Sequence, residues 1–437
     1  MKIDVQGKRV AFVSTRIAGT DGVSLEIGKW ACVLKRMGLE CFYFTGESDR
    51  PADRTELIPE AHFNHPEILD INERAFGVEE RDAKLTDDIH RLARQLRNRL
   101  NKAIQQYQID AVITENALTI PMNLPLGLAI VEAVQENIVG CVAHHHDFHW
   151  ERDRFMINAV DDYLRYAFPP ALQQIQHVVI NSPQAQQFSR RTGQSCRIIP
   201  NVMDFSNPPP PPDDYARGFR KAIGLAEDDL LLLQPTRVVA RKGIEHAVEL
   251  ARRLGTDRAK LVISHASGDE GDDYQQRIID YAAMMNVQLF LVDQWISDQR
   301  GTTPDGRQLF TLADVFSQAD LVTYPSEYEG FGNAFLEAVY HKQPLVCNRY
   351  TIYRSDIEPC GFKTATFDGY LTSDAVDHIR RVLTDSQYRQ EMVDHNYEVA
   401  REYFSYEVLE SELRLMVGRP HNVYRLISRR NKRELPR

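Results

Sequence analysis

Several features that would assign this 437-residue chain to a class at once are missing from it. Its six cysteines include no C-x-x-C pair, and none lies near a histidine at the spacing of a zinc site, so we expect reduced thiols. No apolar run approaches the roughly 20 residues that span a bilayer, and the first residues lack the apolar core of a signal peptide. These absences predict a cytoplasmic protein without a strong membrane signal.

The chain also has fewer positively than negatively charged residues. The chain carries 52 lysines and arginines against 62 aspartates and glutamates, a formal net charge of -10. Binding to the phosphates of duplex nucleic acid usually needs a basic surface, so we expect no nucleic-acid partner. The remaining composition, 43% hydrophobic and 26% charged, is that of a globular protein long enough for two or three domains, and it indicates no oligomeric state.

The first half of the chain alternates short apolar runs with helical patterns. The run "RVAFVST" (9–15) is followed by the glycine-containing segment "AGTDGVS" and by a helical pattern over residues 25–37. A second helical stretch, rich in charge, covers residues 81–107. Runs typical of buried strands cover residues 40–46, 110–116, 139–145, 177–182 and 196–201. Strand and helix in this rhythm predict a parallel α/β domain.

A run of five prolines at 208–212 then interrupts the pattern. Proline cannot occupy the interior of a helix or of a central strand, so the segment is typical of a semi-rigid linker. The rhythm restarts after it, with predicted strands at 230–237, 259–265, 287–293, 319–326 and 343–349. We therefore predict an N-terminal domain over 1–205, a linker over 206–215, a C-terminal domain over 216–400, and a helical segment over 401–437 that could return to the first domain.

Two such α/β halves predict a cleft between them, because doubly wound sheets bind ligands beyond the carboxyl ends of their strands. One loop at such an end reads "PSEYEGFGN" (325–333). Gly330 and Gly332 let the backbone turn sharply, and the helix that follows offers free N–H groups to an anion. Glu329 in the loop and Glu337 in the helix could accept hydrogen bonds from a sugar and from a ribose diol. The same spacing also fits two ordinary glutamates that favour a helix N-terminus.

Two further loops follow predicted strands. Arg237 and Lys242 flank the turn after the strand at 230–237, where two cations could neutralise a diphosphate or simply meet solvent. The loop "TRIAGTDGVSLE" (15–26) matches neither the G-x-G-x-x-G fingerprint nor the P-loop. Taken alone, this loop indicates no more than backbone N–H groups that could face a phosphate.

The segment "AHHHDFHWERDRF" (143–155) concentrates histidines and carboxylates. A metal site needs ligands that converge at a helical or turn spacing such as H-E-x-x-H, which is absent, so we expect no metal. Side chains alternate faces along a strand, so His144 and His146 should share one side and His145 the other. Of these and His149, we favour His146 as the residue that faces the ligand; a strand that ended earlier would favour His144.

Together these loops resemble the retaining glycosyltransferases of family 4, which have the GT-B fold, two Rossmann-like doubly wound α/β domains facing a central cleft. The resemblance covers nearly the whole chain and rests on "IIPNVMDF" (198–205), "RVVARKGI" (237–244) and "SEYEGFGNAFLEAV" (326–339). The family carries Glu-x7-Glu, an Arg and a Lys five residues apart, a glycine loop near the N-terminus, and often His-Asp at a strand end. The matching residues are Glu329 and Glu337, Arg237 and Lys242, Asp21-Gly22-Val23, and His146-Asp147.

The resemblance implies a hexosyltransferase that moves a hexose from a nucleotide-diphosphate sugar, of the GDP-mannose or UDP/ADP-glucose type, to an acceptor hydroxyl with retention of configuration. Arg237 and Lys242 would hold the diphosphate. Glu329 would hold the sugar and Glu337 the ribose. His146 would donate a hydrogen bond to a hydroxyl of the donor sugar or to the charge that develops around the anomeric carbon. The implied donor-binding set is completed by Gly22, Val23, Phe331, Gly332, Asn333 and Ala334. No cofactor and no metal are implied, because cationic side chains replace Mg²⁺ at the diphosphate.

One stretch departs from the family pattern. Many relatives carry Gly-Gly-x-x-Glu after the strand that follows the Glu-x7-Glu helix, but here the chain has Tyr350, Tyr353 and Arg354. A contact that backbone normally makes there to the sugar or the diphosphate is therefore not predicted, and Arg354 is expected to take a different role.

The sequence defines the acceptor less closely than the donor. It shows no Lys/Arg-rich amphipathic helix with exposed aromatics near the N-terminus, the usual sign of a lipid-linked acceptor, so we expect a small soluble molecule or a carbohydrate. Arg16, Arg152 and Arg154 could receive a carboxylate or a phosphate on it. Two alternatives stay open: a nucleotide-sugar epimerase of the same fold, and a catalytically silent regulator that binds a nucleotide sugar.

Overall fold

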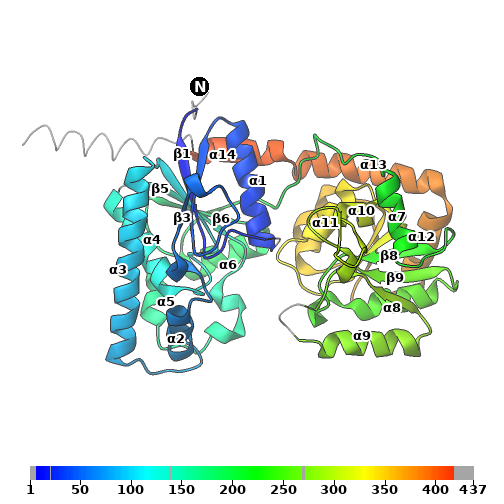
Figure 1. Cartoon of the computed structure of the whole chain (residues 1–437), viewed down its shortest axis with the longest axis horizontal. Helices are drawn as coiled ribbons and strands as arrows, with labels where there is room; N and C mark the ends of the chain where they lie inside the picture. The colour runs from blue at the N-terminus through cyan, green and yellow to red at the C-terminus, as the bar shows by residue number, and fades with distance from the viewer. Residues whose placement is uncertain (1–5, 20, 138, 268–270, 418–437) are drawn as a thin grey trace, which may run out of the picture. The chain divides into compact units, whose positions relative to one another are not determined.

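The computed structural model describes residues 6–19, 21–137, 139–267 and 271–417, and it divides the chain into two compact units. Unit 1 consists of Met1–Asn201 and Tyr406–Arg437, and unit 2 of Val202–Ser405. Each unit contains one parallel β-sheet with helices, so the predicted pair of doubly wound α/β domains is confirmed (Figure 1). The cleft expected with this fold stays a prediction.

The sheet of unit 1 has seven strands in the order β3-β2-β1-β4-β5-β6-β7. These strands are β1 (Arg9–Val13), β2 (Glu40–Thr45), β3 (Thr55–Leu57), β4 (Ala111–Glu115), β5 (Gly140–His145), β6 (Ile175–Val179) and β7 (Cys196–Ile198). The strand order reverses beside β1, so the loops after β1 and β4 diverge at the carboxyl edge of the sheet, where such folds leave room for ligands.

The helices of unit 1 are α1 (Gly22–Arg36), α2 (Pro66–Ala75), α3 (Ala83–Gln106), α4 (Leu124–Asn137), α5 (Asp161–Ala167), α6 (Ser182–Thr192) and α14 (Tyr406–Val417). Helix α1 begins before the predicted residue 25, because the side chain of Asp21 caps it by accepting hydrogen bonds from the backbone of Val23 and Ser24. Helix α14 lies beside α1 (Figure 1), with the Arg36 guanidinium 5.0 Å from the centre of the Tyr406 ring. The rest of the predicted C-terminal segment, 418–437, lies outside the described residues.

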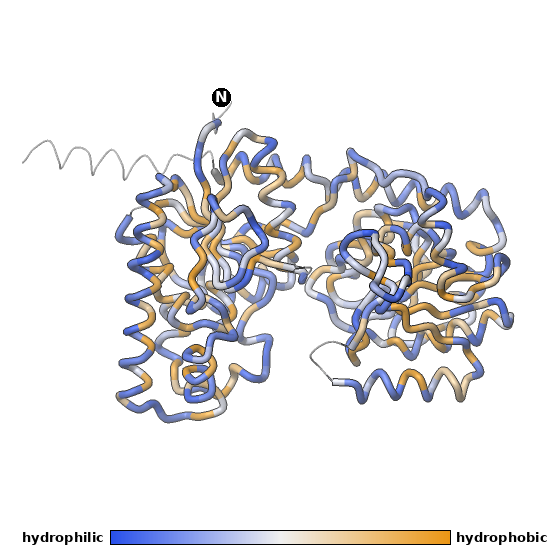
Figure 2. Tube along the Cα trace, viewed as in Figure 1, coloured by the Kyte–Doolittle hydropathy of each residue, from blue (hydrophilic) through white to orange (hydrophobic). Residues whose placement is uncertain are grey.

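The core of unit 1 follows from the periodicity of its helices. Along α3 the buried residues recur every three or four positions, at Leu85, Ile89, Leu92 and Leu96, and this stripe packs against α4. Apolar and polar residues alternate visibly along α3 in Figure 2. Among the described residues, no helix combines the length and the apolar content needed to cross a membrane.

The sheet of unit 2 has six strands in the order β10-β9-β8-β13-β14-β15. Its strands are β8 (Leu230–Gln234), β9 (Ala259–Ile263), β10 (Gln288–Leu291), β13 (Leu321–Tyr324), β14 (Leu345–Asn348) and β15 (Ala365–Phe367). Its helices are α7 (Asp214–Ala222), α8 (Ile244–Arg253), α9 (Asp273–Met284), α10 (Leu312–Ser317), α11 (Asn333–Tyr340), α12 (Ser373–Thr384) and α13 (Ser386–Tyr403). The short antiparallel hairpin of β11 (Gly301–Thr302) and β12 (Gln308–Leu309), together with β3 and β15, was not predicted.

Candidate active-site residues in the two units

In unit 2 the two loops with predicted donor-binding residues follow neighbouring strands, β8 and β13. The loops are bonded to each other, since the backbone N–H of Glu327 donates to the carbonyl oxygen of Arg241 at 2.9 Å. Gly243 has a φ of +57°, and a Cβ there would lie 2.7 Å from the carbonyl oxygen of Pro325. Glycine is therefore required at this crossing, which brings Lys242 toward Glu329.

Lys242 and Glu329 form a buried ion pair. Lys242 is 8% and Glu329 9% exposed, and the ammonium group bonds to Glu329 Oε1, while the Arg241 guanidinium lies 3.5 Å from Oε2. Burial alone would raise the pKa of Glu329, but the charge and hydrogen bond of Lys242, with Ser326 and Arg241, hold this pKa below its usual value. The carboxylate is therefore ionised. On the other side of the pair, burial is the largest effect and lowers the pKa of the Lys242 ammonium group.

The other predicted residues of unit 2 lie in the loop after β8 and at the start of α11. Arg237 is exposed in the loop after β8, and burial together with the charges of Lys242 and Arg237 lowers the pKa of His265. His265, which follows β9, was not singled out from the sequence. Gly332 caps α11 at a φ of +132°, so Phe331, Asn333 and Ala334 lie around the helix start, and Glu337 is partly buried on the same helix.

Tyr350 explains how the chain departs from the family pattern. Its side chain is 2% exposed, and its hydroxyl donates a hydrogen bond of 2.8 Å to the carbonyl oxygen of Phe331. A Cβ at Gly332 would collide with this hydroxyl, so tyrosine and glycine fit each other. Arg354 lies exposed at 3.5 Å from Asp368. Tyr350 therefore holds the glycine loop in place through its hydrogen bond to Phe331, a role that the sequence alone did not reveal.

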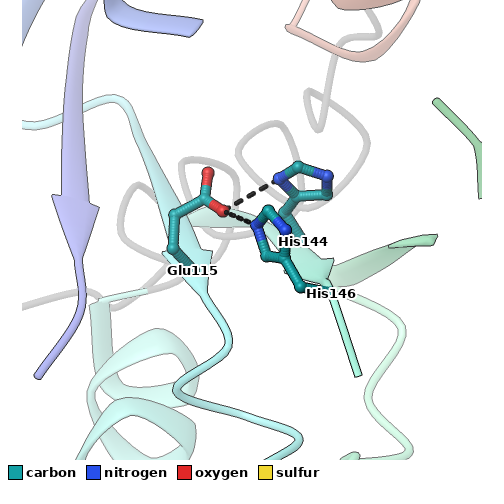
Figure 3. Close-up of side chains that lie close together, drawn as sticks. All are labelled: Glu115, His144 and His146. Atoms are coloured by element: carbon teal, nitrogen blue, oxygen red, sulfur yellow. Dashed lines mark hydrogen bonds and ion pairs between the residues drawn. The ribbon is translucent and has the colours of Figure 1, made fainter. Parts of the chain in front are cut away.

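In unit 1 the histidine segment meets a carboxylate from the neighbouring strand (Figure 3). The register of β4 and β5 pairs Glu115 with His144. The Nδ1 atom of His144 and the Nε2 atom of His146 lie 2.8 and 3.0 Å from the same oxygen, Glu115 Oε2. On the other face, His145 bonds to His177 at 2.9 Å. The predicted alternation of the histidines is confirmed.

This cluster of Glu115, His144 and His146 is enclosed. Glu115 and His144 are each 1% exposed, and the indole of Trp30 stacks on His144 with ring centres 4.3 Å apart. Burial alone would raise the pKa of Glu115, but the two imidazoles hold it below its usual value. Burial alone would lower the pKa of His146, but its bond to Glu115 outweighs burial and raises it. These three residues can also place one ligand atom each within 4.8 Å of one another, as a metal ion requires.

Sequence reasoning missed Glu115 because it lies 29 positions before His144. No short motif spans that separation. The available signal was a carboxylate at the end of a predicted strand, 110–116, in a fold that collects ligands at strand ends.

A small cavity of about 110 Å³ lies in unit 1, and its lining includes Arg16, Asp21, Val23, Glu115, Asn116 and Arg152. Each of the two guanidinium groups is already held by a carboxylate. Arg16 lies 2.9 Å from Asp21, and the Nε atom of Arg152 donates to Asp147 at 2.6 Å. Arg154 instead stacks over the ring of Phe155 at 4.5 Å. The structure thus brings together two of the three predicted acceptor-binding arginines, and Val23 of the predicted glycine loop.

Comparisons with known proteins match this chain over most of its length. The profile of a family described as "Glycosyl transferases group 1" matches residues 306–399. A mannosylglucosylglycerate synthase of Thermotoga maritima is 31% identical, over 93% of this chain and 98% of that protein. A mannosylglucosylglycerate synthase of Petrotoga mobilis is also 31% identical, over 82% and 86% respectively. The crystal structure of a glycosyltransferase from Rickettsia africae superposes with a TM-score of 0.64 at 12% identity, covering 95% of this chain and 99% of that one, which shows a shared fold.

Proposed function

This chain belongs to the group 1 glycosyl transferases, the family 4 enzymes of GT-B fold, and we propose that it moves a hexose with retention of configuration to a small acceptor that bears a carboxylate. The observation that carries the acceptor assignment is the placement of Arg16 and Arg152 in the wall of one small cavity. Guanidinium groups bind carboxylates through paired hydrogen bonds. Because Asp21 and Asp147 already offset much of their charge, the pair suits a monoanion better than a doubly charged phosphate.

The names of two relatives support a more specific proposal. Both are mannosylglucosylglycerate synthases, and the product in that name joins mannose, glucose and glycerate. For this chain we propose a mannosyl nucleotide as the donor and a glucosylglycerate-like molecule as the acceptor. The carboxylate of its glycerate part would bind between Arg16 and Arg152.

The donor side of the reaction is proposed from unit 2. Lys242 would exchange its partner Glu329 for the diphosphate, assisted by Arg237, and Glu337 would hold the ribose. Glu329, released from the ion pair, would accept hydrogen bonds from the sugar hydroxyls. In the transfer, the bond from the anomeric carbon to the leaving phosphate oxygen breaks, the acceptor oxygen bonds on the same face, and the departing phosphate takes the acceptor proton. Fixed positive charge at the leaving group lowers the barrier to this step.

The test is incubation with a panel of GDP-mannose, UDP-glucose and ADP-glucose, with and without acceptor. We expect transfer from one donor to glucosylglycerate, and little transfer to its methyl ester or to glucosylglycerol, which lack the carboxylate. Equal rates with charged and uncharged acceptors would contradict the acceptor assignment. Isomerisation of the donor sugar would point to the epimerase, and binding without turnover to the regulator.

A pair of arginine variants locates the carboxylate. Arg152→Gln should raise the acceptor KM by roughly 10–100-fold, because it removes a charge-assisted contact. Arg165→Gln serves as the matched control, since Arg165 is exposed and pairs with Asp161 on the surface of the same unit. Arg154→Gln then decides whether the third predicted arginine contributes. An unchanged acceptor KM in Arg152→Gln would rule the site out.

A further inference from the structure

Three ionisable side chains, Glu115, His144 and His146, lie close together at the ends of β4 and β5, and the charge of a fourth, Glu26, acts on one of them. Glu115 and His144 are almost fully buried, Glu26 on α1 is fully buried, and His146 is partly exposed. The charge of Glu26 acts on His146, which places this second carboxylate near the cluster. Lys29 lies 3.1 Å from Glu26 and offsets its charge. With neutral imidazoles, the buried carboxylate of Glu115 would form no ion pair with any residue that the structure describes, an arrangement that is costly.

Two polar atoms of this cluster also lack hydrogen bonds within the part of the protein that the structure describes. Both imidazoles bond to a single oxygen, Glu115 Oε2. The other oxygen, Oε1, and the second ring nitrogen of His144 are buried and have no hydrogen-bond partner among the described residues. Buried polar atoms in native proteins are nearly always satisfied, so a small group that bonds to this cluster is expected.

The arrangement of the ligand atoms suits a metal ion. Two imidazole nitrogens and a carboxylate oxygen form a common zinc set with one position open. Around a tetrahedral zinc ion with bonds of about 2.1 Å, the ligand atoms stand about 3.4 Å apart. The nitrogen–oxygen distances here are 2.8 and 3.0 Å, and the three residues can place all their ligand atoms within 4.8 Å of one another, so modest shifts of the side chains suffice. His146 follows the last residue of β5 and is partly exposed, which leaves it room to move.

We propose that Glu115, His144 and His146 bind one divalent transition-metal ion of the zinc class. The ion would balance the buried carboxylate, engage Glu115 through one or both oxygens, and tie the end of β4 to the end of β5. Glu115 and its neighbour Asn116 both line the small cavity of unit 1, so the ion would also fix one of its walls. The proposal rests on these buried residues and does not depend on the proposed donor or acceptor. It concerns residues of unit 1, whereas Arg237 and Lys242, which are expected to replace a metal at the diphosphate, belong to unit 2.

The test is a metal titration of the full chain after treatment with a chelator. We expect Co²⁺ to bind at one equivalent with the visible absorption of a four- or five-coordinate nitrogen and oxygen site, and Zn²⁺ to displace it. The thermal midpoint should rise by roughly 5 °C or more at a hundredfold excess of Zn²⁺ over its Kd. The affinity should increase with pH, because the imidazoles must lose their protons to bind the ion.

Three variants make the outcome specific to this cluster. His144→Gln should weaken Co²⁺ binding by roughly 100-fold or more, since it removes a ligand. Glu115→Gln, which keeps the shape of the side chain, should also weaken Co²⁺ binding by roughly 100-fold or more. This variant provides the test if His144→Gln does not fold. His149→Gln is the control, because His149 lies in the same segment but outside the cluster and should bind as the wild type does.

Two results would overturn the proposal. One is a wild-type chain that shows no Co²⁺ spectrum at one equivalent, which would mean that protons balance the cluster. The other is equal affinity in the wild type, His144→Gln and Glu115→Gln, which would place the ion elsewhere. Anomalous diffraction at the zinc edge, with a peak among the three ligand atoms, gives an independent answer. None of these measurements uses transferase activity, so failure of the proposed function would not affect them.

Discussion

Two buried carboxylates, Glu115 in unit 1 and Glu329 in unit 2, both lie at or just after the carboxyl end of a parallel strand, but they have different partners. Glu115 is the last residue of β4, and Glu329 lies in the loop after β13. Glu115 is bonded to two imidazoles, whereas Glu329 is paired with an ammonium group and has a guanidinium nearby. Imidazoles ordinarily titrate near neutral pH, whereas ammonium and guanidinium groups ordinarily titrate well above it. Burial, however, lowers the pKa of Lys242.

Because their partners differ, the two carboxylates suit different chemistry, although both lie in a parallel α/β unit. The Lys242–Glu329 pair holds a cationic side chain against a carboxylate, so it suits a site where a phosphate must be held as it leaves. Histidines exchange protons or bind metal ions, so the cluster of Glu115, His144 and His146 suits a site whose charge depends on pH or on a bound cation. Four predictions test how far this contrast holds.

The largest contrast is expected in stability. Glu329→Gln leaves the ammonium group of Lys242 buried without its counter-charge and should lower the free energy of unfolding by about 3–5 kcal/mol. Glu115→Gln should cost less, about 1–3 kcal/mol, because an imidazole ordinarily loses its proton near neutral pH and is then buried without a charge. Urea denaturation of both variants checks this, and equal costs would show that the partners of the two carboxylates do not matter.

Activity should depend strongly on the cationic side chain of Lys242 in unit 2. Lys242→Ala removes a cation that is proposed to stabilise the leaving diphosphate, and turnover should fall by roughly 10²–10³-fold. Lys221→Ala, at an exposed position near the end of α7 in the same unit, is the control and should keep normal turnover. The thermal midpoint of Lys242→Ala should be recorded, so that a folding defect is not mistaken for a catalytic one. Near-normal turnover in this variant would contradict the diphosphate assignment.

The histidines of unit 1 should separate by the face of β5 on which they lie. Alanine at His146 should lower turnover by roughly 10–100-fold, with a smaller loss at His144, since these two share Glu115. Alanine at His145 should mainly lower stability, because this residue packs with His177 and Phe148 inside the unit. Kinetics with saturating acceptor, together with thermal midpoints, separate the two effects. A dominant catalytic loss at His145 or His149, with His144 and His146 silent, would refute this assignment.

The smallest expected effect is a pH dependence of stability in chelator-treated protein. The pKa of His146 is raised in the folded chain: burial lowers it, and Glu115 with Glu26 and Asp147 more than compensates. The stabilisation is therefore complete below the unfolded histidine pKa of about 6.5 and is lost as pH rises through the folded value. The cost of Glu115→Gln should shrink over that range, at most by about 1.4 kcal/mol per pH unit. The cost of Glu329→Gln should change less, since the ordinary pKa of lysine lies well above this range. Parallel pH profiles for the two variants would remove the contrast.

Much of the fold and part of each site could be predicted, because local chemistry encodes them. Alternation of apolar runs with helical patterns predicted both sheets, and side-chain alternation along β5 placed His144 and His146 on one face. Short elements such as β3, β15 and the hairpin of β11 and β12 escaped, because two or three residues carry too little periodicity to detect.

By itself, the sequence determined the fold class, the order of the strands along the chain, and which loops after strands carry the charged candidate residues. These properties depend on neighbours within a few positions, where backbone geometry sets which side chains share a face. Only the tertiary structure decided that Glu115 meets His144 and His146, because the pairing of β4 with β5 joins residues 29 positions apart. It likewise decided that Tyr350 supports the loop at Phe331 and that Lys242 finds Glu329. The physical reason is that strand order and register are set by the packing of the whole sheet, and no short segment carries that information.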